Sequence, residues 1–173
     1  MWLVLQNLFS LFQKIRIYTI RFVIAQFELL FERKVSLFYN AIFERETLLI
    51  IDIGANRGQT IDFFHKLNQK TFIYSFEPNP KLFEILEKKY NSNKSISLIQ
   101  KGVSNMQETK IFYENVLHES STFEELNMES KYLKVKSSIL GVKPKNIVKD
   151  SYPVEVTTLS HFIKSKGLKS IDI

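Results

Sequence analysis

The spacing of apolar and polar residues divides the chain into two parts. Residues 1–43 are strongly apolar and contain neither Gly nor Pro, so we predict a helical segment there. From residue 44 onward, short apolar runs alternate with stretches whose apolar residues recur at helical spacing. This alternation predicts an α/β domain over residues 44–173, built on a parallel sheet with right-handed crossovers.

Individual elements follow from the same pattern. Apolar runs bounded by turn residues predict strands, which fall at residues 48–53, 71–76, 95–100, 108–114 and 153–157. The first of these is apolar enough to be buried on both faces of a parallel sheet. Helical spacing predicts helices from Gln59 onward and at residues 80–90, 123–126 and 158–163. Residues 130–150 are rich in Lys, and we expect a loop insertion with a short helix there.

The N-terminal segment places most of its polar residues on one stripe of a helix: Gln6, Asn7, Ser10, Gln13, Lys14, Arg21 and Glu28. The remaining arc is almost entirely apolar and should not be left in water. Lys14, Arg16 and Arg21 interrupt the apolar run before it reaches the ~20 uncharged residues that a membrane span needs. The charge also follows the apolar part, which is atypical of a secretory signal.

Three interpretations of residues 1–43 remain open. The segment packs, as a helix or helical pair, on the domain or on a second copy of the chain; it lies on an anionic membrane, with Trp2 and the basic residues at headgroup depth; or it is a membrane anchor. The absence of cysteine fits a reducing compartment. We therefore expect a cytoplasmic protein, which the second and third interpretations would associate with a membrane.

Composition narrows the classes of function. A chain of 173 residues with 45% hydrophobic residues and 15 Phe can bury one substantial core, so we expect one domain with an appendage. The lack of Cys excludes disulfides, thiolate metal sites and cysteine nucleophiles. The net charge of +6 comes with lysines spread through the second half, so no nucleic-acid partner is expected. His65, His118 and His161 lack ligand spacing, so no metal site is expected.

A strand, a glycine turn and a helix N-terminus follow one another after residue 48. Gly54 and Gly58 bracket the turn, where the backbone needs φ > 0 or must approach a ligand closely, and the helix offers unpaired N–H groups. Asn56 stands where a dinucleotide-binding fingerprint has its second glycine, and Asp52 would repel a pyrophosphate. S-adenosylmethionine, which is cationic and bears an amino group, would tolerate that carboxylate better.

A second acidic residue, Glu77, follows the second predicted strand, 23 residues after Gly54. An acidic residue at about this distance is placed to hold a ribose, because its two oxygens can each accept a hydrogen bond from a hydroxyl. Pro78 and Pro80 prevent the strand from continuing. A solvated Glu at a strand end is the alternative for this residue.

Two motifs, Asp52-Ile53-Gly54-Ala55-Asn56-Arg57-Gly58-Gln59 and Phe76-Glu77-Pro78-Asn79-Pro80, resemble those of the FkbM family of S-adenosylmethionine-dependent methyltransferases. Further matches follow in order at Val103-Ser104, Ser120-Ser121 and Val156-Thr157-Thr158-Leu159. The resemblance covers residues 48–173. It implies a Rossmann-like class I methyltransferase fold, with residues 44–173 as a partial S-adenosylmethionine-binding domain and S-adenosyl-L-methionine as the cofactor.

The resemblance also implies roles for particular residues. Asp52, Gly54, Asn56 and Gly58 would surround the methionine part of the cofactor, Glu77 would hold the ribose, and Ser104 would lie near the adenine. Ala55 and Pro78 complete the expected cofactor set, and Ser120 and Ser121 are candidates for substrate contact. Family members commonly methylate hydroxyl oxygens, which implies a natural-product, sugar or glycan acceptor and a place in glycan or polysaccharide biosynthesis.

Two departures from the family pattern matter. Thr158-Leu159-Ser160 replaces the usual Thr-Leu-Asp, and the sequence stops at Ile173, where the family continues into a Lys-Ile-Asp-x-Glu-Gly motif. We therefore expect a chain truncated at its C-terminus relative to the family, with its general base beyond Ile173. The alternative is a non-catalytic remnant or nucleotide-binding module that retains the cofactor pocket. An NAD-dependent oxidoreductase is a weaker idea, because Asn56 occupies the turn.

The segment around His118 and Ser120 raises a hydrolase as a further possibility. No G-x-S-x-G elbow surrounds either serine of this segment, which speaks against nucleophilic catalysis. Thr122 and Glu125 instead have the spacing of a capping box. We therefore predict that Thr122 begins the short helix over residues 123–126.

Overall fold

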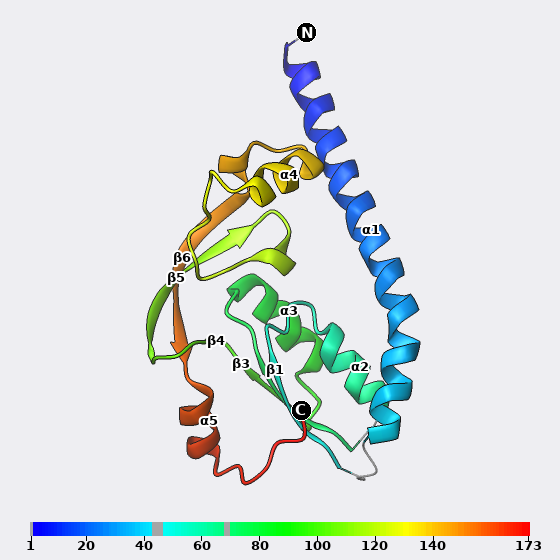
Figure 1. The fold of residues 1–173 in the computed structure, drawn as a ribbon, viewed down its shortest axis with the longest axis vertical. Helices are drawn as coiled ribbons and strands as arrows, with labels where there is room; N and C mark the ends of the chain where they lie inside the picture. The colour runs from blue at the N-terminus through cyan, green and yellow to red at the C-terminus, as the bar shows by residue number, and fades with distance from the viewer. Residues whose placement is uncertain (1, 43–46, 68–69) are drawn as a thin grey trace. The chain divides into compact units, whose positions relative to one another are not determined.

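The computed structural model describes residues 2–42, 47–67 and 70–173, coloured along the chain in Figure 1. The chain divides into two compact units. One comprises residues 1–42 with 125–148, and the other comprises residues 43–124 with 149–173. The expected domain boundary between residues 43 and 44 lies outside the described residues and stays a prediction.

The second unit contains a parallel sheet of β1 (Leu49–Ile53), β2 (Phe72–Phe76) and β3 (Ile96–Ile99), in that order. The helix α2 (Gln59–Leu67) joins β1 to β2, and α3 (Pro80–Tyr90) joins β2 to β3. Parallel strands need such crossover connections, because a tight turn cannot return the chain to the same end of the sheet. The α/β alternation expected from the sequence is confirmed for this part of the chain.

The two faces of this sheet are not equally buried. The face that carries Ile50 and Ile73 is fully covered, whereas Ile53 on the other face is 53% exposed. Figure 1 shows α2 and α3 on one side of the sheet and α5 (Leu159–Lys166) on the other. Phe162 of α5 packs edge-to-face on Phe76 and covers only part of the second face. Leu49 and Ile51 on that face are half-buried, so the expectation that β1 is buried on both faces is wrong for the second face.

The edge of β1 that does not face β2 pairs with Asp172 and Ile173. Asp172 N and Ile173 N donate to Leu49 O, and Ile51 N donates to Ile173 O at 2.9 Å. One residue that bonds to the neighbours on either side of Ile50 is the pattern of a parallel ladder. The Asp172 carboxylate accepts a further hydrogen bond from Leu49 N at 2.9 Å. These residues therefore continue the parallel sheet beyond β1.

The same unit also contains β4 (Gly102–Val103), β5 (Glu108–Asn115) and all but the first residue of β6 (Val148–Thr157). These strands form a second sheet in the order β4-β6-β5, with β4 parallel to β6. The 3₁₀ helix η1 (His118–Ser120) follows β5. The helix α5 begins where the Thr158 hydroxyl accepts a hydrogen bond from His161 N at 3.1 Å, which satisfies one of the free donors of its first turn.

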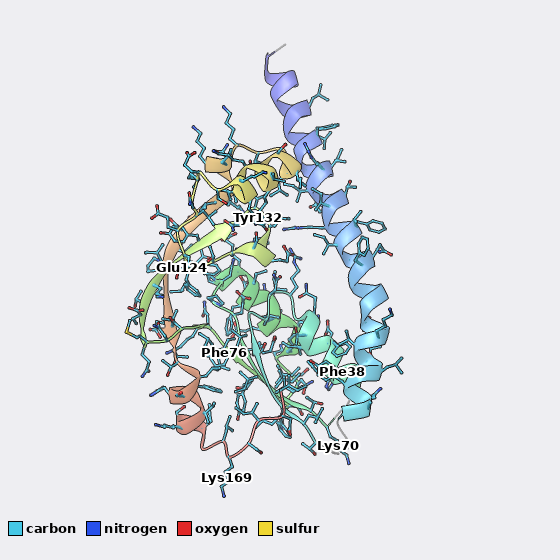
Figure 2. The ribbon with its side chains drawn as sticks, in the orientation of Figure 1. Phe38, Lys70, Phe76, Glu124, Tyr132 and Lys169 are labelled. Carbon is cyan, nitrogen blue, oxygen red and sulfur yellow. The ribbon has the colours of Figure 1, made fainter. Side chains whose placement is uncertain are left out.

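The core of this unit joins the parallel sheet to its helices. Phe76, labelled in Figure 2, and the side chains of Ile50, Ile61 and Leu86 are fully buried. Burying each such side chain contributes about 1.5–3 kcal/mol relative to leaving it in water. This packing fixes the ends of β1 and β2, from which the candidate site is built.

The first unit is helical. The segment from Trp2 to Ile42 is one continuous helix, α1, so the helical-pair form of that prediction is wrong. It is accompanied by α4 (Lys131–Leu140) and the 3₁₀ helix η2 (Pro144–Asn146). Arg16 Nη2 donates to Ser138 O at 2.9 Å and joins α1 to α4. Within the described ranges, we find no helix with enough apolar length to span a bilayer.

The predicted helix at residues 123–126 does not form. Thr122 instead pairs with Tyr113 in an antiparallel bridge, and its hydroxyl accepts from Glu124 N rather than from Glu125 N. The Phe123 ring packs on Phe112 with 5.1 Å between the ring centroids. Packing with β5 therefore overrides the local capping-box pattern.

Candidate functional site

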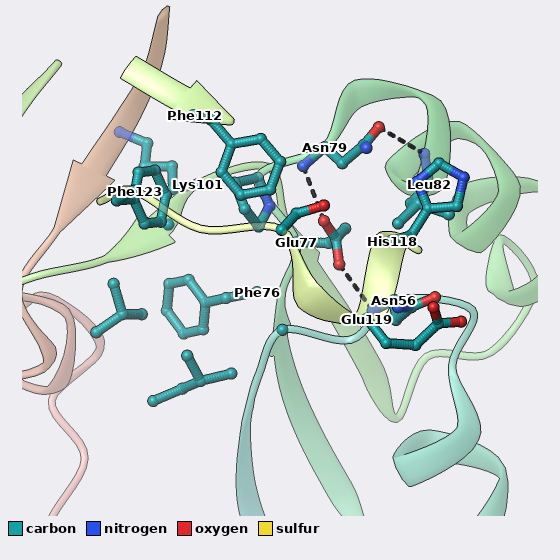
Figure 3. Close-up of a pocket in the computed structure, with 16 residues that line it drawn as sticks. Asn56, Phe76, Glu77, Asn79, Leu82, Lys101, Phe112, His118, Glu119 and Phe123 are labelled. Carbon is teal, nitrogen blue, oxygen red and sulfur yellow. Dashed lines mark hydrogen bonds between the residues drawn. The ribbon is translucent and has the colours of Figure 1, made fainter. Parts of the chain in front are cut away.

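A cavity of about 310 Å³ lies at the carboxyl ends of β1 and β2 (Figure 3). This is the end of a parallel sheet where α/β proteins bind their ligands. Its volume lies near the lower limit of ~300–1,000 Å³ that is usual for ligand pockets. The cavity is lined by Ile53, Gly54, Asn56, Phe76, Glu77, Pro78, Asn79, Leu82, Lys101, Gly102, Val103, Phe112, His118, Glu119, Ser121 and Phe123.

The glycine turn after β1 forms one wall of the cavity. Gly54 and Ala55 both donate from their backbone N–H groups to Phe76 O, at 2.8 and 2.9 Å, which fastens the turn to the end of β2. Gly54 has φ +88°, a conformation that side chains disfavour. Asn56 is also left-handed, with φ +50°, which Asn tolerates better than most residues.

The Glu77 carboxylate is held between two backbone donors, as Figure 3 shows. Asn56 N donates to Glu77 Oε2 at 2.7 Å, and Asn79 N donates to Glu77 Oε1 at 2.8 Å. The residue is only 4% exposed, so it is not a solvated residue at a strand end. Burial raises the pKa of this carboxyl, the two backbone donors lower it, and the charge of Asp52 raises it. The net direction is upward.

Asn79 connects the cavity to the start of α3. Its Oδ1 accepts from Lys81 N at 2.9 Å and Leu82 N at 3.3 Å, which caps the helix. The other polar atom of the Asn79 side chain, Nδ2, is buried, and so is Asn56 Oδ1. In the described part of the chain, neither atom has a hydrogen-bond partner. A buried unpaired donor or acceptor is costly. These two atoms at the cavity therefore fit a polar ligand.

Asp52 does not line the cavity but lies within β1, opposite Ser75 in the sheet register. Ser75 Oγ donates to Asp52 Oδ2 at 2.7 Å. Burial raises the pKa of the Asp52 carboxyl above its usual range, while hydrogen bonds from Ser75 and Thr60 oppose that shift. The upward direction means that burial dominates.

The other expected cofactor residues divide into two groups. Gly54, Asn56, Glu77 and Pro78 line the cavity, whereas Asp52, Ala55, Gly58 and Ser104 do not. Ala55 is buried behind the turn, and Ser104 Oγ donates to Asn105 Oδ1 at 3.2 Å. The contribution of each residue to cofactor binding stays a prediction.

The two candidate substrate serines face different surroundings. Ser121 lines the cavity, and its Oγ accepts from Asn115 N at 3.1 Å. Ser120 lies within η1, where its Oγ donates to Leu117 O at 2.8 Å. The structure therefore brings Ser121, and not Ser120, to the cavity.

Several cavity residues were missed in the sequence. Lys101 lies at the cavity and forms a 2.8 Å ion pair with Glu155, while Phe112 and Phe123 provide an aromatic wall. His118 and Glu119 come from η1 (Figure 3). No local motif marks these positions, because β5 and η1 reach the cavity only through the fold. The Phe-Glu-Pro-Asn-Pro motif did contain Asn79, whose capping position after a strand was an available signal.

A fully buried carboxylate, Glu114, lies beside His118 at the end of β5. Lys81 Nζ is 3.2 Å from Glu114 Oε2, and Lys149 Nζ is 3.6 Å from Glu114 Oε1. His118 Nδ1 is also 3.6 Å from Glu114 Oε1, and the Tyr152 hydroxyl donates to Glu114 Oε2 at 3.3 Å. These contacts from three different elements, α3, η1 and β6, compensate the buried charge.

Within the described residues, no group of three or more His, Asp and Glu side chains is arranged to hold a metal ion.

A family model described as "Methyltransferase FkbM domain" matches residues 52–173. The match begins at Asp52 and includes the cavity residues from Ile53 to Phe123. No curated protein matches the chain.

Proposed function

The chain belongs to the FkbM methyltransferase family, and we propose that it transfers a methyl group from S-adenosyl-L-methionine to a hydroxyl oxygen of a sugar or natural product. We further propose that its α/β unit is Rossmann-like, of the class I methyltransferase kind. The parallel order of β1, β2 and β3, with a cavity at their carboxyl ends, supports this assignment.

The observation that carries the proposal is the fixed carboxylate of Glu77 at the cavity. Each of its oxygens already accepts one backbone hydrogen bond, and each retains acceptor capacity, because an ionised carboxylate offers about four lone-pair positions. A ribose with two adjacent hydroxyls would use that capacity. Asn79 Nδ2 and Asn56 Oδ1 would supply one donor and one acceptor to the same ligand.

Charge also favours this cofactor over a dinucleotide. Asp52 and Glu77 place two acidic groups at the ends of adjacent strands, one of them lining the cavity. A pyrophosphate would be repelled there, whereas a sulfonium with an amino group would be attracted. When bound, the cofactor would supply a methyl group attached to a positively charged sulfur, and this sulfur is a good leaving group.

The acceptor would bind against the wall formed by Phe112, Phe123, His118 and Glu119. Aromatic surface with a few polar groups is typical of small-molecule sites, and His118 and Glu119 could orient a hydroxyl by hydrogen bonds. The task of the chain is then to align the acceptor oxygen with the methyl group, while a base removes the hydroxyl proton.

Calorimetric titration with S-adenosylhomocysteine tests the cofactor assignment. Glu77→Ala should lose about 2–3 kcal/mol of binding free energy, which is about 30- to 150-fold in affinity. Glu77→Gln should also weaken binding, because its amide NH₂ would face the N–H of Asn56 or Asn79. Glu84→Ala is the matched control, because Glu84 is an exposed residue of α3 whose carboxylate pairs with Lys88 and lies outside the cavity lining. Wild-type affinity in Glu77→Ala would contradict the assignment.

Methyl transfer is tested separately by incubation with isotope-labelled cofactor and a panel of sugars and hydroxylated natural products. We expect a labelled methyl ether in the product mass spectrum. Cofactor binding without transfer to any hydroxyl acceptor would instead favour a nucleotide-binding module that lacks catalysis.

A further inference from the structure

The excess positive charge of the chain belongs to one of its two units. Residues 1–42 and 125–148 contain ten of the 24 Lys and Arg residues but four of the 18 Asp and Glu residues. This leaves 14 of each sign in the unit that contains the candidate site. The whole net charge of +6 is therefore carried by the unit of α1 and α4. The sequence hides this asymmetry, because the unit is assembled from two separate segments.

The same unit exposes an apolar stripe on the first half of α1. Its members recur every three or four residues and are 53% to 70% exposed: Leu8, Leu11, Ile15, Tyr18 and Phe22. At 100° per residue they share one side of the helix, and Lys14 and Arg16 flank that side. Exposed apolar side chains with cations along their borders are typical of helices that lie in a membrane interface.

The helix α4 extends this surface. A groove of about 460 Å³ between the two helices is lined mostly by apolar side chains, including Phe12, Ile20 and Ile139. Tyr132, labelled in Figure 2, is 73% exposed on α4. Lys131, Lys143 and Lys145 are also exposed in this unit. Apolar and cationic groups therefore occur together on both helical segments.

We propose that this unit binds the surface of an anionic membrane, with the stripe of α1 in the boundary between headgroups and acyl chains. The proposal goes beyond methyl transfer and does not depend on it. A second copy of the chain is the competing occupant, but two units that each carry +6 would repel one another. An anionic bilayer attracts the same charge.

Sedimentation of the full chain with lipid vesicles tests the proposal. We expect binding to vesicles with 40% phosphatidylglycerol, at least tenfold weaker binding to pure phosphatidylcholine, and release from the former in ~0.5 M salt, which screens charge beyond a few ångströms. Equal binding to the two vesicle types, or none to either, would overturn the proposal.

Two pairs of variants separate charge from apolar contact. Substituting Lys14, Lys131 and Lys145 by Gln should weaken binding about 100-fold, whereas the same change at the exposed Lys94, Lys164 and Lys169 of the other unit should leave it unchanged. Substituting Leu11 and Phe22 by Ser should weaken binding at least tenfold. Ile85 and Met106, which are 43% and 55% exposed in the other unit, are the matched apolar controls.

Analytical ultracentrifugation of the same variants distinguishes the competing occupant. Without lipid, we expect the wild type and the variants with Leu11→Ser and Phe22→Ser to be monomers. A wild-type dimer that Leu11→Ser and Phe22→Ser dissociate would show that a second copy covers this face, and it would overturn the membrane assignment. Circular dichroism of each variant confirms that α1 remains helical.

Discussion

The Tyr90 hydroxyl, at the end of α3, lies 3.0 Å from the carbonyl oxygen of Gly58 and 2.7 Å from Asp62 Oδ1. Its single hydrogen is shared between the glycine turn and the first turn of α2. Burial raises the pKa of Tyr90 well above its usual value, and the hydrogen bond to Asp62 and the negative charge of that residue raise it further. The hydroxyl therefore stays protonated and connects α3 to the loop that follows β1.

This contact makes Gly58 less tolerant of substitution than Gly54. Both have strongly positive φ, +85° and +88°, which costs a non-glycine residue about 1–2 kcal/mol. A Cβ at Gly58 would also lie 2.8 Å from Tyr90 Cε2, whereas one at Gly54 would meet no atom within 4 Å. We expect Gly58→Ala to destabilise the fold by about 1–3 kcal/mol more than Gly54→Ala in urea unfolding.

A double-mutant cycle identifies the cause of that difference. Tyr90→Leu removes the hydroxyl and the ring, so Gly58→Ala should cost less in that background, while the cost of Gly54→Ala should not change. Equal costs for Gly58→Ala in both backgrounds would mean that backbone strain alone acts.

Asn79 should affect stability and cofactor affinity through different atoms. Asn79→Ala removes the cap of α3 and should lower stability by about 0.5–2 kcal/mol. Asn79→Ser keeps a capping oxygen but lacks the amide nitrogen, so it should fold almost as stably as the wild type. Both variants should bind S-adenosylhomocysteine more weakly. Wild-type affinity in Asn79→Ser would show that Nδ2 does not contact the cofactor.

Asp52 should make stability depend on pH in the direction opposite to that of a paired surface carboxylate. Its folded-state pKa is raised by burial, so its stabilising effect is complete below the unfolded pKa of about 4 and is lost as pH rises through the folded pKa. Asp52→Asn should therefore be more stable than the wild type at pH 7, by about 1.4 kcal/mol for each unit by which the pKa is raised.

Chemical unfolding of both proteins from pH 3.5 to pH 8 checks this expectation. The difference between them should become small at the acid end, where Asp52 is mostly protonated in both states. Glu77, whose pKa is also raised, remains in both proteins, but its pKa should be raised less in Asp52→Asn, because the charge of Asp52 contributes to that shift. A wild-type protein that exceeds the variant at pH 7 would contradict the predicted direction.

Glu114 should be more important for stability than an exposed carboxylate with one partner. Glu114→Gln keeps the shape but removes the charge that Lys81 and Lys149 contact, and we expect a loss of about 1–3 kcal/mol. Glu155→Gln is the matched control, because the pair of Glu155 with Lys101 is exposed and should contribute little to stability. Thermal unfolding followed by circular dichroism measures both, and equal losses would show that burial adds nothing at Glu114.

Elements specified by local chemistry were predictable from the sequence. Pro80 and the preceding Asn79 define the start of α3, and the helix occupies residues Pro80–Tyr90 as predicted. The strand–turn–helix unit around Gly54 likewise follows from its own residues. The helix expected at residues 123–126 was wrong because Thr122 pairs with Tyr113, and a local pattern cannot reveal that pairing.

The candidate site could be predicted only in part for the same reason. Gly54, Asn56, Glu77 and Pro78 belong to short motifs and lie at the cavity. Lys101, Phe112, His118 and Glu119 reach it from β5, η1 and the loop before β4, whose positions depend on pairing across the unit. The basic unit was hidden too, because residues 125–148 join α1 only in three dimensions.

The pairing of Leu49 with Asp172 has a consequence for the order of folding. The two residues are 123 positions apart, and contacts so distant in sequence form late, because a long loop must close before they are gained. We therefore expect β1, which carries the glycine turn, to pair with residues 172 and 173 only after it has assembled with α2 and β2. Until then, one edge of β1 would have unpaired backbone N–H and C=O groups. Such an edge can pair with a strand of another chain, which favours aggregation.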